Sequence, residues 1–329
     1  MRTRRLGNSD LHITPIGFGA WAIGGGNWKF GWGNQDDENS VRVVHEALDH
    51  GVNWIDTAPV YGHGHSEEIV GRALAELPAS RRPMVFTKCG HPWDANGDLH
   101  YSLKPADLRR ECEDSLRRLR VDAIDLYQFH WPQPEEELED GWRTMQDLKA
   151  EGKVRWVGVC NCSIDQMKKL TAFGPVTSHQ MHYSLLRPSV ERGELPFCQE
   201  NGVGVLAYSP MGSGLLTGTI DRAFIDALPE SDWRKNGHPH FREPLLSRNL
   251  ELVDLLKAIG ARHGVIAGAV AVAWVLRHRG VTAAIVGGRE PGQFHEPVAA
   301  AEWRLTPAEE REITVFVAAH PAKAEEWGD

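Results

Sequence analysis

The sequence has little that would tie the protein to a membrane or to an extracellular disulfide scaffold. Five cysteines in 329 residues are sparse and odd in number, which fits reduced thiols in a cytosol. No apolar run approaches the roughly 20 residues needed to span a bilayer. The basic start MRTRR is not followed by the apolar segment of a secretory signal. We therefore expect a cytoplasmic protein that does not bind a membrane.

Runs of lysine and arginine are also missing, and the formal net charge is −9. A chain of this charge without a basic tract is a poor constitutive partner for nucleic acid or an anionic surface. Cys160 and Cys162 lack the second ligand pair that a zinc site requires, so we expect no metal. The expected partner is therefore a small molecule, and the sequence leaves the oligomeric state open.

What the chain does have is a regular alternation of short apolar runs with segments of helical period. Eight such βα alternations imply a parallel sheet with crossover helices. Eight units close naturally into a (β/α)8 TIM barrel, with an open doubly wound sheet as the alternative. No linker or low-complexity segment interrupts residues 1–329, which are predicted to form one domain. The predicted strands cover residues 16–19, 53–56, 84–88, 123–129, 154–160, 178–181, 203–209 and 283–286.

Additional elements are predicted at both ends of this pattern. The opening RRLGNSDLHITPIG indicates a short β-hairpin before the first barrel strand. An extra helix is expected beyond the eighth unit, and residues 212–247 are predicted as a long loop over one end of the barrel. The predicted helices cover residues 38–50, 66–77, 105–119, 135–151, 164–172, 190–199, 248–279 (as two helices), 291–300 and 307–318.

Four ionisable residues stand at or just after predicted strand ends in the first half: Asp56, Tyr61, Lys88 and His130. In a βα-barrel the carboxyl ends of the strands meet at one mouth, where the chemistry is placed. A tyrosine hydroxyl can protonate a carbonyl oxygen if a nearby cation lowers its pKa, and Lys88, held by Asp56, would supply that cation. His130 could orient the substrate oxygen or relay the proton. The set can reduce a carbonyl group if another molecule supplies hydride.

Each member of this quartet also has a simpler explanation. Asp56 could cap a turn, and Tyr61 could be a partly buried aromatic. Lys88 could be a solvated surface charge, and His130 a loop histidine with a local partner. Their joint occurrence at successive strand ends favours a shared site over four separate explanations.

Several segments resemble the aldo-keto reductases: DTAPVYG, FTKCG and LYQFHWP, then GVCNCS and AYSPMGSGLLTG, within a similarity that spans essentially the whole chain. The segments WGNQDDENS and AIVGGREPGQ are similar to the bacterial branch that also contains relatives of potassium-channel β-subunits. The resemblance implies a cytosolic (β/α)8 barrel that uses NADPH. It also implies Tyr61 as the general acid, Lys88 and Asp56 as its tuning pair, and His130 as the group that orients the substrate.

The nicotinamide end of the cofactor is expected at the barrel mouth. The segment GFGAWA formally matches the dinucleotide fingerprint G-x-G-x-x-G/A, but a loop and not a helix follows, so no Rossmann site is predicted. The resemblance instead places Gly19, Ala20 and Trp21 near the nicotinamide and the substrate. It further implies an amide pair (Asn161, Gln180), a ring for stacking (Tyr208) and a pyrophosphate loop (Ser209, Met211, Gly212, Leu215).

The adenosine end is expected after the last strand. Gly287 and Gly288 permit close backbone approach, and Gln293 is placed on the first turn of a helix whose N-terminus would favour a phosphate. Arg289 is the candidate partner of a 2′-phosphate, because guanidinium suits phosphate geometry; a solvated surface charge is the alternative. NADPH is therefore preferred over NADH.

Two departures from the family pattern weaken that preference: Glu290 adds a negative charge beside the expected phosphate, and Pro297 stands where many relatives carry Asn. The predicted function is NADPH-dependent reduction of aldehydes or ketones, with hydride from nicotinamide and a proton from Tyr61. One alternative is a cofactor-binding docking protein, like the channel β-subunits, with little turnover. Another is a Schiff-base aldolase that uses Lys88 as its nucleophile.

Overall fold

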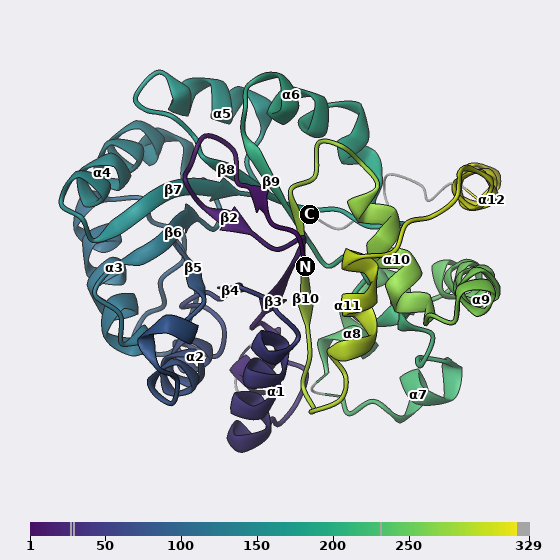
Figure 1. The fold of residues 1–329 in the computed structure, drawn as a ribbon. Helices are drawn as coiled ribbons and strands as arrows, with labels where there is room; N and C mark the ends of the chain where they lie inside the picture. The colour runs from purple at the N-terminus through teal and green to yellow at the C-terminus, as the bar shows by residue number, and fades with distance from the viewer. Residues whose placement is uncertain (27, 29, 231, 321–329) are drawn as a thin grey trace.

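The computed structural model describes residues 1–26, 28, 30–230 and 232–320, with a closed barrel of eight parallel strands at its centre (Figure 1). The barrel strands are β3 (Ile16–Gly19), β4 (Trp54–Asp56), β5 (Met84–Cys89), β6 (Ile124–Phe129), β7 (Val154–Cys160), β8 (Ser178–His182), β9 (Gly204–Tyr208) and β10 (Ala283–Gly287). They pair in sequence order, and β10 closes the ring against β3. The predicted TIM barrel is therefore confirmed, and the open doubly wound alternative is wrong.

Helices surround the ring of strands (Figure 1). They are α1 (Asp37–Asp49), α2 (His65–Ala75), α3 (Pro105–Leu119), α4 (Leu138–Ala150), α5 (Ile164–Thr171), α6 (Glu194–Glu200), α7 (Arg222–Ala227), α8 (Trp233–Asn236), α9 (Leu245–His263), α10 (Ala267–Leu276), α11 (His295–Val298) and α12 (Pro307–Ala319). In the described part of the chain, no single helix is long and apolar enough to cross a membrane; only α9 and α10 together reach that length and composition, as a pair bent by 92°.

The predicted loop over residues 212–247 was partly wrong, because it contains α7 and α8 and two short 3-10 turns. Both α7 and α8 begin with an aspartate cap. The Asp221 side chain accepts a hydrogen bond from Phe224 N at 2.8 Å, and the Asp232 side chain accepts one from Arg234 N at 3.0 Å. Such caps satisfy the free amides of a helix start. Helices of six and four residues are too short to show a period, which is why the pattern missed them.

The helix predicted from residue 291 was also wrong at its start. The chain turns at Gly292, where φ is +91°, and α11 begins only at His295. Gln293, expected on the first helical turn, instead precedes the helix and closes a turn. Its Oε1 atom accepts hydrogen bonds from the backbone N–H groups of Arg289 at 3.0 Å and Glu290 at 3.2 Å. A four-residue helix offers little of the phosphate-binding N-terminus that the sequence suggested.

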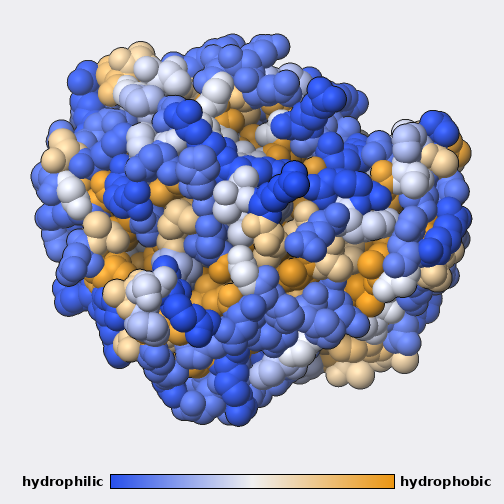
Figure 2. Space-filling view, viewed as in Figure 1, coloured by the Kyte–Doolittle hydropathy of each residue, from blue (hydrophilic) through white to orange (hydrophobic). Residues whose placement is uncertain are grey.

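The predicted N-terminal hairpin is formed by β1 (Arg4–Arg5) and β2 (His12–Ile13), and it lies across the middle of the ring in Figure 1. Leu6, Leu11 and Ile13 from this segment pack with barrel side chains such as Trp54 and Phe86 in one buried cluster. The hairpin therefore closes one end of the barrel. Hydrophilic residues predominate on the face seen in Figure 2, and hydrophobic ones show between them as small patches.

The first glycine of β3, Gly17, is required by the packing of side chains inside the barrel. A side chain at Gly17 would place its Cβ atom 2.1 to 2.4 Å from ring atoms of Trp54. Trp54 is fully buried, and its Nε1 atom donates to the carbonyl oxygen of Thr14 at 3.0 Å. The glycine of the formal fingerprint thus makes room for a tryptophan inside the barrel.

We expect Gly17→Ala to lower the free energy of unfolding by about 1–3 kcal/mol, because an inserted methyl group must displace the packed Trp54 ring. Urea denaturation followed by far-UV circular dichroism measures this change. Gly193→Ala is the matched control, since a Cβ there lies at an ordinary 3.5 Å from Ile164 Cδ1. Equal stability of Gly17→Ala and the unmodified protein would contradict the packing argument.

Candidate active site

The four predicted catalytic side chains meet at the carboxyl end of the barrel. Asp56 ends β4, Lys88 lies in β5, His130 directly follows β6, and Tyr61 lies between β4 and α2. The Lys88 Nζ atom is 2.5 Å from Asp56 Oδ1 and 3.2 Å from the Tyr61 hydroxyl oxygen. The rings of Tyr61 and His130 meet edge to face, with centroids 5.7 Å apart. The structure therefore brings the quartet into one cluster.

The ion pair at the centre of this cluster is buried: the side chains of Lys88 and Asp56 are 0% and 4% exposed. Burying two charges is costly unless other polar groups satisfy them. Lys88 Nζ also donates to the carbonyl oxygen of Thr57 at 2.9 Å. Asp56 Oδ2 accepts from Gln180 Nε2 at 2.7 Å, and Gln128 Nε2 lies 3.5 Å from the same oxygen. Both charges are thus held by hydrogen bonds as well as by each other.

The protonation states follow from burial and from this pair. Burial alone would lower the pKa of Lys88, but the carboxylate of Asp56, with a smaller effect of Tyr61, outweighs burial and raises the pKa, so the side chain is an ammonium. Burial raises the pKa of Tyr61 and exceeds the lowering by Lys88, so the hydroxyl keeps its proton. Lys88 does lower the pKa of Tyr61, as expected, but by less than burial raises it. Burial, with the charge of Lys88 second, holds the pKa of His130 well below its usual range, so the imidazole is neutral.

The three residues expected beside the nicotinamide lie at the same mouth. Gly19 ends β3, and the backbone N–H of Ala20 donates to the Asp56 carbonyl oxygen at 2.8 Å. The rings of Trp21 and Tyr61 lie 5.0 Å apart between centroids. The turn after β3 is thereby fixed against Tyr61, the predicted general acid.

The amide pair and the stacking ring predicted in the second half also lie together. The Tyr208 hydroxyl donates to Asn161 Oδ1 at 2.8 Å, and Asn161 Nδ2 donates to the His130 carbonyl oxygen at 3.1 Å. Asn161 has a φ of +53°, a conformation that is uncommon outside glycine and that often marks functional sites. One face of the Tyr208 ring stacks on His182, with centroids 5.0 Å apart. A bound carboxamide would therefore share or replace bonds that Asn161 and Gln180 already make.

The predicted pyrophosphate loop is a compact turn beyond β9. Ser209 and Gly212 have φ values of +53° and +57°. The Gly212 N–H donates to the Ser209 carbonyl oxygen at 2.9 Å, and the Leu215 N–H donates to that of Gly212 at 3.1 Å. The carbonyl oxygen of Met211 accepts from the next amide along the chain, that of Leu216, at 3.0 Å. Two of the amides predicted to reach a phosphate are thus engaged inside the turn.

The residues expected at the adenosine end lie at and beyond the end of β10, which is Gly287. A Cβ atom at Gly287 would meet only the backbone oxygen of Gly19, at 3.2 Å, and a Cβ atom at Gly288 would lie 3.1 Å from a methyl carbon of Val43. Arg289 is held by the loop between β3 and α1. Its Nε atom donates to Gln35 Oε1 at 2.8 Å, its Nη1 to the carbonyl oxygen of Trp32 at 2.9 Å, and its Nη2 to that of Asn34 at 2.6 Å. These acceptors are all neutral, so Arg289 is not the solvated surface charge of the alternative interpretation.

The sequence reasoning missed a second arginine beside this loop. Arg234 is 6% exposed and is bound by Asp232, with Nη2 and Oδ2 2.6 Å apart. Its guanidinium group also lies 4.5 Å from the ring centroid of Trp32. The spacing Asp-Trp-Arg in a polar stretch carries no signal of such a contact. Gln128, a buried amide near the end of the predicted strand β6, was a signal that could have been used.

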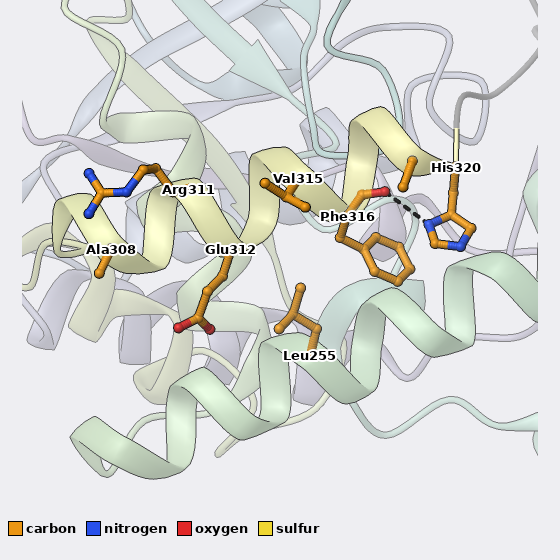
Figure 3. Close-up of a pocket in the computed structure, with 8 residues that line it drawn as sticks. Leu255, Ala308, Arg311, Glu312, Val315, Phe316 and His320 are labelled. Carbon is orange, nitrogen blue, oxygen red and sulfur yellow. Dashed lines mark hydrogen bonds between the residues drawn. The ribbon is translucent and has the colours of Figure 1, made fainter.

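A separate shallow groove lies between α9 and α12, away from the barrel mouth (Figure 3). None of the four catalytic candidates contributes to it. It is lined by Leu255 of α9 and by Ala308, Arg311, Glu312, Val315, Phe316, Ala319 and His320 of the α12 segment. Within the described residues, no group of three or more His, Cys, Asp or Glu side chains is arranged to hold a metal ion.

Comparison with known proteins agrees with this geometry. The model of the Aldo/keto reductase family matches residues 15–317, so the chain belongs to the aldo-keto reductase family. It is 35% identical over 318 residues to aldo-keto reductase YhdN of Bacillus subtilis, covering 96% of this chain and 94% of the relative. It is 33% identical over 324 residues to an NADH-specific methylglyoxal reductase of Escherichia coli, covering 94% and 96%. The solved structure of a glycerol dehydrogenase from Gluconobacter oxydans superposes with a TM-score of 0.88 at 39% identity, covering 97% and 96% of the two chains.

The ion pair makes a testable contribution to stability. We expect Lys88→Met to lower the free energy of unfolding by about 3–5 kcal/mol, because it leaves Asp56 charged and buried without its cation. The double variant Asp56→Asn, Lys88→Met removes both charges and is expected to lose less. Chemical denaturation of the single and double variants measures both values. A double variant that is less stable than Lys88→Met would contradict this account.

Proposed function

We propose that this aldo-keto reductase is a cytoplasmic carbonyl reductase that uses a nicotinamide cofactor, preferably NADPH, to reduce small aldehydes and ketones. The observation that carries the proposal is the protonated Tyr61 hydroxyl, buried and 3.2 Å from the Lys88 ammonium. That arrangement supplies a proton to an oxygen on which negative charge develops. Five buried free cysteines fit a reducing compartment.

The chain's own residues divide the work. Tyr61 donates its proton to the carbonyl oxygen as that oxygen becomes more basic than tyrosinate. Lys88 stays charged, held by Asp56, and offsets the negative charge that forms on Tyr61. His130 is neutral, and its ring stands edge to face beside Tyr61, where it can orient the oxygen by hydrogen bonding. A bound nicotinamide would supply the hydride.

The residues present fit such a cofactor. The indole N–H groups of Trp21, Trp32 and Trp233 are buried and have no acceptor among the described residues. Buried donors normally find a partner, and a diphosphate or carboxamide is rich in acceptors. Asn161 directly follows β7, Tyr208 ends β9 and Arg289 lies beyond β10, so an extended dinucleotide spanning these positions is part of the proposal.

The preference for NADPH rests on Arg289. Its three side-chain hydrogen bonds go to neutral oxygens. A 2′-phosphate could replace these acceptors and form stronger, charge-assisted hydrogen bonds with the guanidinium group. Glu290 opposes this preference with a negative charge beside Arg289, and its Oε2 atom accepts a hydrogen bond from Asn39 Nδ2 at 2.6 Å. The relative named NADH-specific shows that the family accommodates the other cofactor, so the choice needs measurement.

The limited space around the Tyr61 ring favours small substrates. The rings of Trp21 and Trp28 lie 5.0 and 5.9 Å from the Tyr61 ring, and the Lys88 Nζ atom lies 5.1 Å from the same centroid. Two relatives carry names that concern small polar molecules, methylglyoxal and glycerol. We therefore place short-chain aldehydes and hydroxyketones first in a substrate panel.

The two alternative functions make different demands. A Schiff-base aldolase needs a neutral lysine amine, whereas the pKa of Lys88 is raised by Asp56 and Tyr61 against the effect of burial. That raised pKa argues against Lys88 as a nucleophile. A docking protein of the channel β-subunit kind would bind the cofactor and show negligible turnover across the whole carbonyl panel.

We expect Tyr61→Phe to lower kcat by about 100- to 10,000-fold, because it removes the proton donor without changing the ring. Cofactor affinity, measured by fluorescence titration, should stay within about twofold of the unmodified protein's. Tyr101→Phe, at a tyrosine that is 43% exposed, is the matched control and should retain activity. Full turnover by Tyr61→Phe would remove Tyr61 from the proposed role.

We expect Arg289→Met to raise the Kd for NADPH by about 10- to 100-fold and to change the Kd for NADH by less than about twofold. The loss is selective because only NADPH carries the 2′-phosphate. Parallel fluorescence titrations of Arg289→Met and of the unmodified protein with both cofactors measure the difference. Tighter binding of NADH than of NADPH by the unmodified protein would overturn the proposed preference.

A further inference from the structure

The strand that carries Lys88 is held from behind by two buried carboxylates. Glu67 of α2 accepts a hydrogen bond from Thr87 Oγ1 at 2.6 Å, one residue before Lys88. Glu111 of α3 accepts one from the backbone N–H of Gly90 at 2.9 Å, two residues after it. Side chains alternate across a strand, so these helices reach the side of β5 opposite the active site.

The two carboxylates differ in how their charge is balanced. Glu67 pairs with Arg118, whose Nε atom lies 2.7 Å from Oε2. Glu111 is 6% exposed and makes no ion pair within the described part of the chain. Its Oε1 atom is buried and has no hydrogen-bond partner among those residues. Burying an acid without a counter-charge is costly, so the presence of Glu111 at this position calls for an explanation.

What Glu111 holds is the turn that leads from the catalytic strand to the substrate mouth. Gly90 has a φ of +85°, and a Cβ there would lie 2.7 Å from Leu103 Cδ2, so only glycine fits this tight turn. The next residue, His91, stacks on Tyr101 with centroids 4.7 Å apart. The ring of His91 also meets that of His130 edge to face at 6.1 Å.

We propose that Glu111 is a positioning residue for carbonyl reduction: its buried carboxyl group fixes the Gly90–His91 turn and thereby holds the His91 ring beside His130. The inference rests on the proposed function, because it concerns the same mouth. Glu111 acts through the backbone of Gly90 and touches neither Tyr61 nor Lys88. Its effect should therefore fall on substrate binding and not on the proton transfer.

The electrostatic setting makes this role sensitive to pH. Burial raises the pKa of Glu111 to about 8, against the opposing effect of the backbone N–H groups of Gly90 and His91. A carboxylate accepts a stronger hydrogen bond than a neutral carboxyl group does. The hold on Gly90 therefore tightens as the pH rises through about 8. The other titratable groups around it are Glu67 on α2, Cys89 on β5, Asp107 and Cys112 on α3, and Tyr127 on β6.

The first test compares substrate KM between pH 7 and 9 in the unmodified protein, Glu111→Gln and Glu113→Gln. Glutamine keeps an oxygen for the Gly90 N–H but cannot ionise, whereas Glu113 is an exposed acid on the same helix, paired with Lys153. We expect KM to fall by about threefold with rising pH in the unmodified protein and in Glu113→Gln, and to stay flat in Glu111→Gln. The kcat profiles of the three proteins should coincide.

The second test measures stability and needs no activity. A carboxyl group whose pKa rises from 4.5 unfolded to about 8 folded stabilises the folded state below pH 4.5, and that stability is lost as pH rises towards 8. The free energy of unfolding of the unmodified protein, relative to Glu111→Gln, should therefore fall between these values and level off above about pH 8. Urea titrations at intervals of one pH unit measure this difference.

The outcomes separate this inference from the proposed function. A relative stability that does not change with pH would overturn the ionisation of Glu111. A KM profile that is the same in Glu111→Gln and the unmodified protein would overturn its positioning role. Absence of turnover in the unmodified protein with every carbonyl would instead overturn the proposed function, and the inference would fall with it, even if the stability curve behaves as expected.

Discussion

The mouth of this barrel depends on one buried ion pair, between Lys88 Nζ and Asp56 Oδ1 at 2.5 Å. The pair joins β4 to β5, and Gln180 extends it to β8 through the second oxygen of the carboxylate. Charges withdrawn from water are stable only in a well-satisfied arrangement, and here each charge has further hydrogen-bond partners. The same bonds that satisfy the charges therefore fix the relative positions of strands on opposite sides of the barrel. Tyr61 and Asn161 lie around this ion pair, which cannot shift without exposing a charge.

Burial and the ion pair together set the protonation state of Tyr61. A lone ammonium 3.2 Å from a phenol would lower its pKa strongly. Here burial raises the pKa of Tyr61 by more than Lys88 lowers it, and the charge of Asp56 adds to the raising effect. In the proposed reaction, the hydroxyl keeps its proton until a stronger base forms beside it. Lys88 would then face a new negative charge on Tyr61, which is when its field contributes most.

Much of the fold, and the clustering of the four candidate residues, could be predicted from sequence because both depend on local patterns. Most barrel strands are rich in apolar residues, although β8 (Ser178–His182) is not, and Asp56, Lys88 and His130 stand where apolar runs end. The prediction of one domain over residues 1–329 stays a prediction, and residues 321–329 lie outside the described part. What local patterns could not reveal were contacts between distant segments. Gln180 reaches Asp56 across 124 residues of sequence, and Arg289 reaches the loop at Gln35 across 254.

The short helices α7 and α8 escaped prediction for a different reason. They contain fewer than two helical turns each, so their stability comes from aspartate caps and from packing and not from an apolar period. The turn at Gly292 similarly depends on the side chain of Gln293, which only the folded geometry places beneath the amides it binds. Tertiary context, which one sequence does not display, decided the structure in both places.

The strand β5 shows how the front and the back of a barrel wall are linked. Lys88 points into the barrel, where Asp56 neutralises it, while Thr87 and Gly90 are held from the helix side by Glu67 and Glu111. Glu67 forms an ion pair with Arg118, whose Nε atom lies 2.7 Å from Oε2. Glu111 has no such counter-charge within the described residues, so in our proposal a change of its protonation would alter the turn that leads to His91. Because Tyr61, Lys88 and His130 each keep one protonation state near neutral pH, the proposal assigns any variation of the mouth with pH to this wall and not to the candidate quartet.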